Sequence, residues 1–186
     1  MALPAPATTR PDRYPKAARL FHWLMAAMII AAWCIGFFDV HFRGNLPRAP
    51  LVMAHKGLAS AVIFVAVARL IYRWRARRAY PPLPEGTSPA QALAAHTVHG
   101  LLYALAMIAA PMTGWFWSSV AGKPILMFGL IPVPPIAAAD PGLYELARSL
   151  HVAVVWSAGA LIALHLLAVI KHQVLDRDGV LGRMLR

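Results

Sequence analysis

The stretch HVAVVWSAGALIALH, residues 151–165, is a run of apolar and small residues with a histidine at each end. Over fourteen residues an α-helix turns through roughly 1400°, about 40° short of four full circles, and rises by roughly 21 Å. His151 and His165 therefore share one helix face at two different depths. An ionisable group inside a membrane-spanning helix is costly unless it has a partner. Each histidine therefore needs a partner at its own depth.

The rest of the chain is equally apolar. Of its 186 residues 60% are hydrophobic and only 13% are charged, which is far too apolar for a soluble domain of this size. Four windows approach the ~20 residues that a helix needs to cross a bilayer. They cover residues 20–38, 52–72, 95–118 and 149–170. We predict an all-α integral membrane protein, a four-transmembrane-helix bundle over residues 19–186, preceded by a flexible cytoplasmic arm over residues 1–18.

The basic residues are distributed unevenly along the chain. Residues 10–19, 73–78 and 171–186 each contain four Lys or Arg, whereas the first and third connections contain few. The positive-inside rule then predicts that both termini are cytoplasmic. This placement also explains the net charge of +11 without nucleic acid as a partner. Cys34 is the only cysteine, which excludes a disulfide, a Cys-based zinc or iron–sulfur site and covalent haem attachment.

The predicted topology supplies partners for both histidines. The first helix runs outward with His22 near its inner end, and the second runs inward with His55 near its outer end. This gives two depth-matched pairs, His22 with His165 and His55 with His151. A single buried histidine is usually a core residue, but four in two pairs indicate metal ligation. Two imidazoles on one iron leave no open coordination site, so we predict two haems that serve electron transfer, stacked between the helices.

The fourteen-residue interval recurs elsewhere in the chain. Arg69 follows His55, Gly36 follows His22, and Gly114 follows Gly100 by this interval. Arg69 is therefore expected to face the inner haem level, where it would contact a haem propionate or a quinone. The glycines would let helices approach a flat porphyrin. With twelve glycines in the chain, one or two such coincidences are also expected by chance.

Two further histidines lie one turn apart at the inner start of the third helix. His96 and His99 are rivals for the cytoplasmic haem, but they would equally contact a propionate or a quinone, or neither. With Arg69 and Arg73 they are the candidates to line a quinone site near that haem. His41, in the outer loop, and His172, at the cytoplasmic end, are expected on the solvated surface.

The connections carry turn and helix signals. Ser88 is expected to cap a helix that has Pro89 at its first position, and Pro111 is expected to kink the third helix. The proline-rich residues 119–147 predict either a lid over the outer helix ends or a loosely ordered loop. An interfacial aromatic belt is predicted from the residues near the span ends: Trp23, Trp33, Trp74, Trp115, Trp117 and Tyr72.

Several motifs occur in the order of the predicted helices. They are RLFHWLMA (19–26), MAHKGLA (53–59), RLIYR (69–73), APMTGW (110–115), FGLIP (128–132) and the His-x13-His of residues 151–165. Over residues 13–186 the chain resembles the bacterial cytochrome b561 family, which is related to the cytochrome b subunits of nickel–iron hydrogenases and formate dehydrogenases.

The resemblance implies two b haems between four helices in the bacterial inner membrane. Carried onto this sequence, it places His22 and His165 on the cytoplasmic haem, and His55 and His151 on the other, which agrees with the pairing from depth. It further implies electron exchange with a quinone pool and, in stand-alone members, oxidation of superoxide at a positively charged outer side.

Three hypotheses about function follow. The first is a dihaem cytochrome that transfers electrons between a donor and ubiquinone; if it is an enzyme, it is a superoxide or other donor:ubiquinone oxidoreductase. Outer basic residues would attract superoxide or pair with haem propionates: Arg43, Arg48, Lys56, Lys123 and Arg148. The alternative is a haem-bearing anchor subunit that passes electrons from a dehydrogenase or hydrogenase to quinone. A metal-ion carrier is disfavoured because the helix cores lack Asp and Glu.

The sequence leaves the donor, the direction of electron flow and the oligomeric state open. The predicted partners are the lipid bilayer and the quinone pool, with either a dehydrogenase partner or a homodimer in addition.

Overall fold

The structure is a computed structural model that describes residues 12–42 and 44–185. In this part of the chain, four helical segments are long and apolar enough to cross a membrane: Lys16–His41, Arg48–Arg75, Pro89–Val120 and Pro141–Asp176. Each contains one of the four predicted windows, so the four predicted long apolar helices are present. The helices extend beyond the windows because they continue through polar and charged residues. The arm predicted for residues 1–18 falls outside the described residues up to residue 11, and Lys16 already belongs to the first helix.

The elements follow one another as a series of helices interrupted by one hairpin. In order they are α1 (Lys16–His41), α2 (Arg48–Arg75), the short η1 (Arg77–Ala79), α3 (Pro89–Leu102), the π-helical η2 (Tyr103–Ala109), α4 (Ala110–Val120), β1 (Ile125–Met127), β2 (Ile131–Val133), the short η3 (Pro141–Leu143), α5 (Tyr144–Lys171), the π-helical η4 (His172–Asp176) and α6 (Val180–Leu185). His41 is thus the last residue of α1 and does not lie in a loop as expected, although it is exposed.

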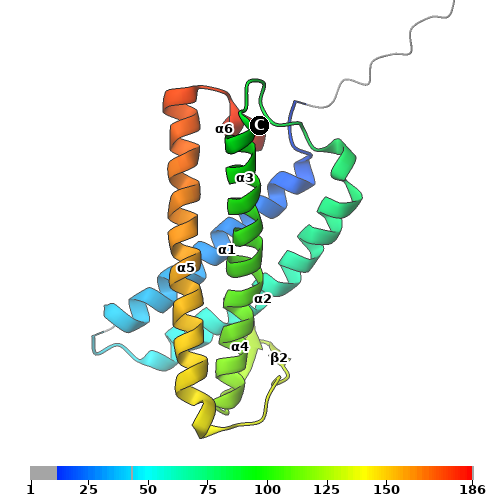
Figure 1. The fold of residues 1–186 in the computed structure, drawn as a ribbon. Helices are drawn as coiled ribbons and strands as arrows, with labels where there is room; N and C mark the ends of the chain where they lie inside the picture. The colour runs from blue at the N-terminus through cyan, green and yellow to red at the C-terminus, as the bar shows by residue number, and fades with distance from the viewer. Residues whose placement is uncertain (1–11, 43, 186) are drawn as a thin grey trace, which may run out of the picture.

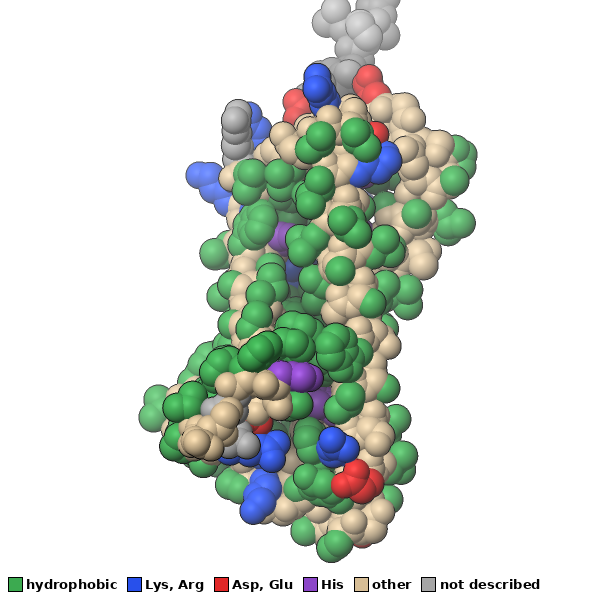
Figure 2. All heavy atoms as spheres, turned by 90° about the vertical axis from the view of Figure 1, so that its left-hand side faces the viewer, with side chains coloured by type: hydrophobic (Ala, Val, Ile, Leu, Met, Phe, Trp, Pro, Cys, Tyr) green, Lys and Arg blue, Asp and Glu red, His purple; other side chains and the backbone are tan. Residues whose placement is uncertain are grey.

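The four spans form two antiparallel pairs (Figure 1). The column of α3, η2 and α4 runs beside α5, and α1 and α2 cross them at an incline. We call the end of the bundle with α6 and the start of α1 the termini end, and the opposite end, with β1 and β2, the hairpin end. On one face, charged side chains lie toward the two ends and apolar side chains cover the region between them (Figure 2). This distribution fits a bundle whose middle lies in hydrocarbon.

The start of α3 agrees with the sequence. Ser88 caps it: the Gln91 amide donates to Ser88 Oγ at 3.2 Å, and the Ser88 amide donates to Gln91 Oε1 at 2.8 Å. Pro89 occupies the first helical position, where its missing N–H leaves no bond unmade. The reciprocal bonds satisfy helix-end donors and confirm the predicted cap.

The third span departs from a regular helix before Pro111. The sequence predicted a kink at this proline, and the structure has the π-helical η2 directly N-terminal to α4. Proline lacks an N–H and its ring clashes with the carbonyl four residues back, which here belongs to Met107, within η2. A wider helical turn accommodates that conflict, and insertions of this kind recur at functional sites.

The connection expected to be a lid or a loose loop is a small hairpin. β1 and β2 pair antiparallel, with Ile125 opposite Val133, so the fold has one two-stranded element that an all-α prediction omits. The Phe128 amide donates to the Gly57 carbonyl of α2 at 3.4 Å. A β-carbon on Gly57 would lie 2.8 Å from the Leu126 carbonyl oxygen, so only glycine permits this approach of hairpin and helix.

The buried core lies among α1, α2 and η2. It consists of Met25, Met28, Ala61, Val62, Ala66 and Met107. By contrast, of the 28 residues of α5, all of them described, Ala147 and Ala158 alone are buried. Most residues of the helix with two of the four candidate ligands therefore lie outside the buried core. Figure 2 shows histidine side chains at two separate heights of this face.

Candidate haem site

The hairpin-end pair consists of His55 from α2 and His151 from α5. Their ring centroids are 6.3 Å apart, at 80° between the ring planes. His55 Nδ1 lies 2.8 Å from the Ala32 carbonyl oxygen, which can only accept, so this nitrogen carries the proton. His151 Nδ1 lies 3.1 Å from Thr113 Oγ1, whose own hydrogen is directed to the Ala109 carbonyl. Both rings therefore use Nδ1 as the donor and leave the Nε2 lone pair for a metal.

The termini-end pair consists of His22 from α1 and His165 from α5. Their ring centroids are 6.5 Å apart, at 65° between the planes. Arg69 Nη2 lies 3.3 Å from His22 Nδ1. Because a guanidinium can only donate, His22 Nδ1 accepts in this arrangement. Arg69 thus lies beside His22.

Both pairs have the spacing that one metal ion between two imidazoles requires. A ligating nitrogen lies about 2.0 Å from its metal and the ring centroid roughly 1.1 Å behind it, so opposite ligands have centroids roughly 6.2 Å apart. The observed 6.5 and 6.3 Å agree with this value. The ring of His99 lies 5.1 Å from that of His165, which is too close for opposite ligands of one iron. The geometry thus favours His22 over His99 as the partner of His165.

Two glycines make room for the ligand rings. A β-carbon on Gly36 would lie 3.1 Å from the His55 imidazole, and one on Gly114 would lie 3.0 Å from the His151 imidazole. Both contacts are tighter than ordinary side chains make, so each glycine lets its helix pass beside a histidine ring. No described atom lies within 4 Å of a β-carbon built on Gly100. The fourteen-residue interval thus identified glycines at the hairpin-end pair, packed against histidine rings.

The other candidates for cofactor contacts lie toward the termini end, but they differ in which residues they contact. Arg69 Nε donates to the Tyr103 hydroxyl at 3.2 Å. The Arg73 guanidinium lies over two rings, 5.8 Å from the centroid of Tyr103 and 5.3 Å from that of Tyr80. Burial raises the pKa of the Tyr80 phenol above its ordinary value, although Arg73 opposes this, so the phenol stays neutral. His96 lies on the exposed side of α3 and bonds to its own helix through the Ala92 carbonyl.

The basic residues of the hairpin end are partly paired. Arg48 Nε lies 3.0 Å from Asp39 Oδ2, and Arg148 Nη1 lies 3.5 Å from Glu145 Oε2. Lys56 Nζ instead donates to Ser118 Oγ at 2.7 Å, and Ser118 Oγ donates to the Lys123 carbonyl at 2.8 Å. The positive charge available for an anion therefore differs among these residues. Arg43 falls outside the described residues.

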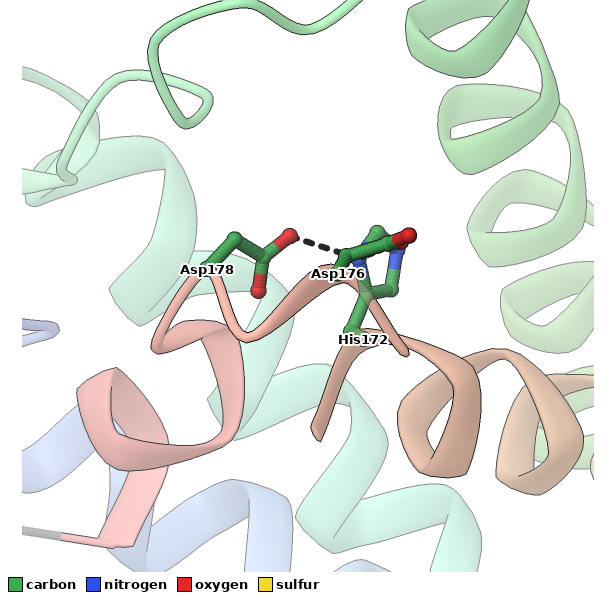
Figure 3. Close-up of side chains that lie close together, drawn as sticks. All are labelled: His172, Asp176 and Asp178. Atoms are coloured by element: carbon green, nitrogen blue, oxygen red, sulfur yellow. Dashed lines mark hydrogen bonds and ion pairs between the residues drawn. The ribbon is translucent and has the colours of Figure 1, made fainter. Parts of the chain in front are cut away.

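A separate group of His172, Asp176 and Asp178 lies at the termini end (Figure 3). His172 Nδ1 lies 2.6 Å from Asp178 Oδ2 and 3.1 Å from Asp176 Oδ2. Lys171 Nζ reaches Asp176 Oδ1 at 2.8 Å, and the Val180 amide donates to Asp178 Oδ1 at 3.1 Å. These bonds hold the turn between η4 and α6. The expected surface histidine is thus half-buried and part of the chain's own C-terminal packing.

Sequence reasoning missed residues that contact a candidate ligand or Arg69. Thr113 fixes the His151 ring, and Tyr103 binds Arg69, yet neither was predicted as part of a site. Thr113 directly precedes Gly114, and its side chain reaches a ligand on another helix. A signal was available there, since a hydroxyl beside a ligand-facing glycine on the same helix is positioned to contact the ligand.

Comparison with known proteins agrees with this geometry. The family model of the prokaryotic cytochrome b561 matches residues 13–186. Cytochrome b561 homolog 2 of Escherichia coli (strain K12) is 33% identical over 182 residues, which cover 96% of this chain and 94% of that protein. The chain therefore belongs to the prokaryotic cytochrome b561 family, whose members are membrane proteins that bind haem b and transfer electrons.

Proposed function

We propose that the chain holds two haems b, one between His22 and His165 and one between His55 and His151. The observation that supports this most strongly is the spacing of the two pairs, 6.5 and 6.3 Å between ring centroids. Haem b supplies an iron that takes up and releases one electron. Two imidazoles on the iron would leave it no open coordination site, which suits electron transfer rather than oxygen binding. The ligands of α5 lie ~21 Å apart along the helix, so the two sites form a path across the membrane.

The protein groups around the ligands fix their orientation. The Ala32 carbonyl holds the His55 ring and Thr113 holds the His151 ring, each through Nδ1. A hydrogen bond from Nδ1 keeps the proton on that nitrogen, so that Nε2 is free to bind the metal, and it makes the imidazole a more basic ligand. The hairpin-end pair is therefore already arranged for iron.

The termini-end pair needs one rearrangement. For His22 to ligate through Nε2 its Nδ1 must carry the proton, and it then no longer accepts from Arg69. Arg69 would turn from the ring toward an acceptor, and a haem propionate is such a group. This supports Arg69 as a propionate-binding residue.

We propose that the termini end faces the cytoplasm of a bacterial inner membrane, because the basic segments lie there. Quinone, with ubiquinone as the expected species, would exchange electrons with the termini-end haem. Arg69, Arg73, His96 and His99 are the proposed residues of that site. Of these, Arg69 lies nearest to a proposed ligand, with its Nη2 3.3 Å from His22 Nδ1. The ring centroid of His99 lies 5.1 Å from that of His165.

The donor is proposed to reach the hairpin end. Superoxide would be attracted by the ammonium groups of Lys56 and Lys123. The pairing of Arg48 with Asp39 and of Arg148 with Glu145 reduces the charge offered to a small anion. This pairing favours the second candidate, a haem-bearing subunit that receives electrons from a partner dehydrogenase or hydrogenase. Association with such a partner, or of two copies of the chain, would be seen in the mass of the purified assembly.

A spectrum with a haem count tests the proposal. The purified protein should show a reduced-minus-oxidised b-type spectrum and two haems per chain in the pyridine haemochrome assay. One haem per chain would overturn the two-site arrangement. Stopped-flow reduction of the haem by superoxide would then support the first donor, and its absence together with a stoichiometric co-purifying dehydrogenase would support the second.

A further inference from the structure

Trp117 in α4 carries a buried hydrogen-bond donor. Its indole Nε1 is shielded from solvent, and no described residue accepts a hydrogen bond from it. In a membrane-depth environment an unmade hydrogen bond is costly, so such a donor is expected to meet an acceptor in the loaded protein. The sequence assigned Trp117 to an interfacial aromatic belt, which does not account for a buried N–H.

The indole lies against the hairpin-end ligand. Its ring centroid is 5.8 Å from that of His151 and 5.9 Å from that of Tyr144. It also lies about one turn beyond Thr113 and Gly114, the two residues of α4 that contact the His151 ring. Thr113, Gly114 and Trp117 of α4 therefore all lie beside the His151 imidazole.

The imidazole itself does not satisfy the indole. His151 Nδ1 is a donor to Thr113, and its Nε2 is the nitrogen assigned to iron. The missing acceptor must therefore come from elsewhere. Haem b, which this family binds, carries two propionate carboxylates, and a carboxylate is a strong acceptor for a buried N–H.

A cation lies at the same level. Lys56 directly follows the ligand His55, and its ammonium bonds to Ser118, which directly follows Trp117. A buried carboxylate needs such a charge nearby as well as hydrogen-bond donors. The neighbourhood of the indole thus offers both requirements of a propionate.

We infer that Trp117 is a positioning residue of the hairpin-end haem and that its indole N–H donates to a propionate carboxylate of that haem. The inference rests on the proposed function, because it needs a haem between His55 and His151. The hydrogen bond withdraws negative charge from the carboxylate and so favours the ferrous state of the nearby iron. Its loss should lower the midpoint potential of one haem without removing that haem.

The test compares Trp117→Phe with Trp115→Phe in potentiometric titrations. Trp115 is the matched control because its Nε1 donates to the Pro134 carbonyl of the connecting loop at 2.9 Å. Trp117→Phe should keep two haems and lower the midpoint potential of one of them. We expect the redox equilibrium of that haem to change by roughly three- to tenfold, where tenfold corresponds to about 59 mV for one electron. Trp115→Phe should leave both potentials unchanged. Unchanged potentials in Trp117→Phe, with two haems retained, would overturn the inference.

Two further experiments show which haem is affected and replace the variant if it does not fold. In a His165→Ala background, which retains the hairpin-end haem, Trp117→Phe should still shift the remaining potential, and in a His151→Ala background it should not. If Trp117→Phe does not fold, the redox infrared difference spectrum of the unmutated protein decides. It should contain an indole N–H band that moves on ¹⁵N labelling of tryptophan, and the absence of this band would overturn the inference. A haem count below two in the unmutated protein would instead overturn the proposed function.

Discussion

At the scale of the residue, the four histidines differ from the other four in what surrounds them. Each of the four has a partner ring on a facing helix at a distance suited to one shared metal ion. His96 and His99 bond back to their own helix, and His41 stacks on Phe37 of its own helix at 4.3 Å. The ring of His99 also faces His165 on another helix, but at 5.1 Å. The spacing of 6.3 to 6.5 Å between ring centroids therefore distinguishes the four candidate ligands.

Substitution of the ligands tests this pairing. His165→Ala should lose the termini-end haem and His151→Ala the hairpin-end haem, because each substitution removes one of the two histidines proposed to bind that iron. His96→Ala, His99→Ala and His41→Ala should each keep two haems. The pyridine haemochrome count per chain is the measurement. Two haems after His165→Ala, or one after His99→Ala, would show that the termini-end pair is assigned incorrectly.

The glycine beside His151 gives a second test. In Gly114→Ala the new methyl group would lie 3.0 Å from His151 Cε1, so the ring must move. Overpacking of this kind costs about 1–3 kcal/mol and should lower the occupancy of the hairpin-end haem while the other is retained. Gly159→Ala is the control, because its methyl group would meet Trp33 at 3.4 Å, an ordinary contact. Equal haem contents in the two variants would contradict the role of Gly114.

The pairing of His22 with His165 and of His55 with His151 could be predicted from the sequence, but the groups that contact these rings could not. Helical periodicity relates His151 to His165, and chain direction supplies the depths of His22 and His55. The partners of the rings, the Ala32 carbonyl and Thr113, lie on different helices from the histidines they hold. Which helix passes beside which is decided by packing in three dimensions, and no spacing within one helix encodes it.

At the scale of the element, the hairpin and the π-helical η2 are two of the features that periodicity did not predict. Three-residue strands are too short to show an alternating pattern, and the prolines around them read as a loop. The residues of η2 are as apolar as those around them, so the sequence pattern does not show that the helix widens there. The cap of α3 was predicted because its signal, Ser88 with Pro89, is local in the sequence.

The contact of the hairpin with α2 can be broken at one position. In Gly57→Ala the methyl group would lie 2.8 Å from the Leu126 carbonyl oxygen and 3.3 Å from the Phe128 amide nitrogen, so the hairpin must move away. We expect a destabilisation of that contact by about 1–3 kcal/mol. Limited digestion with a nonspecific protease should cut residues 121–143 faster than in the unmutated protein. Gly100→Ala, whose methyl group meets no described atom within 4 Å, should leave the digestion unchanged.

At the scale of the whole molecule, the bundle has two ends with different functions in the proposed electron path. The termini end holds Arg69 beside His22, and the hairpin end holds the Lys56 and Ser118 link beside His55. The proposed quinone site and the proposed donor site face opposite sides of the membrane, so the orientation of the bundle decides which compartment each one meets. The distribution of Lys and Arg over short connections is the feature that fixes it in membrane proteins.

Cysteine labelling in intact cells tests that orientation, and the chain is suited to it because Cys34 is its only cysteine. In a Cys34→Ala background, Ala138→Cys places a thiol in the exposed connection after β2, and Glu85→Cys places one in the exposed connection before α3. A membrane-impermeant maleimide added to cells with a permeabilised outer membrane should label Ala138→Cys at once. Glu85→Cys should react only after the inner membrane is lysed, because it lies with the basic segments on the cytoplasmic side. The reverse pattern would place the hairpin end in the cytoplasm and the proposed quinone site at the opposite membrane face, whereas the haem counts of the histidine variants would not change.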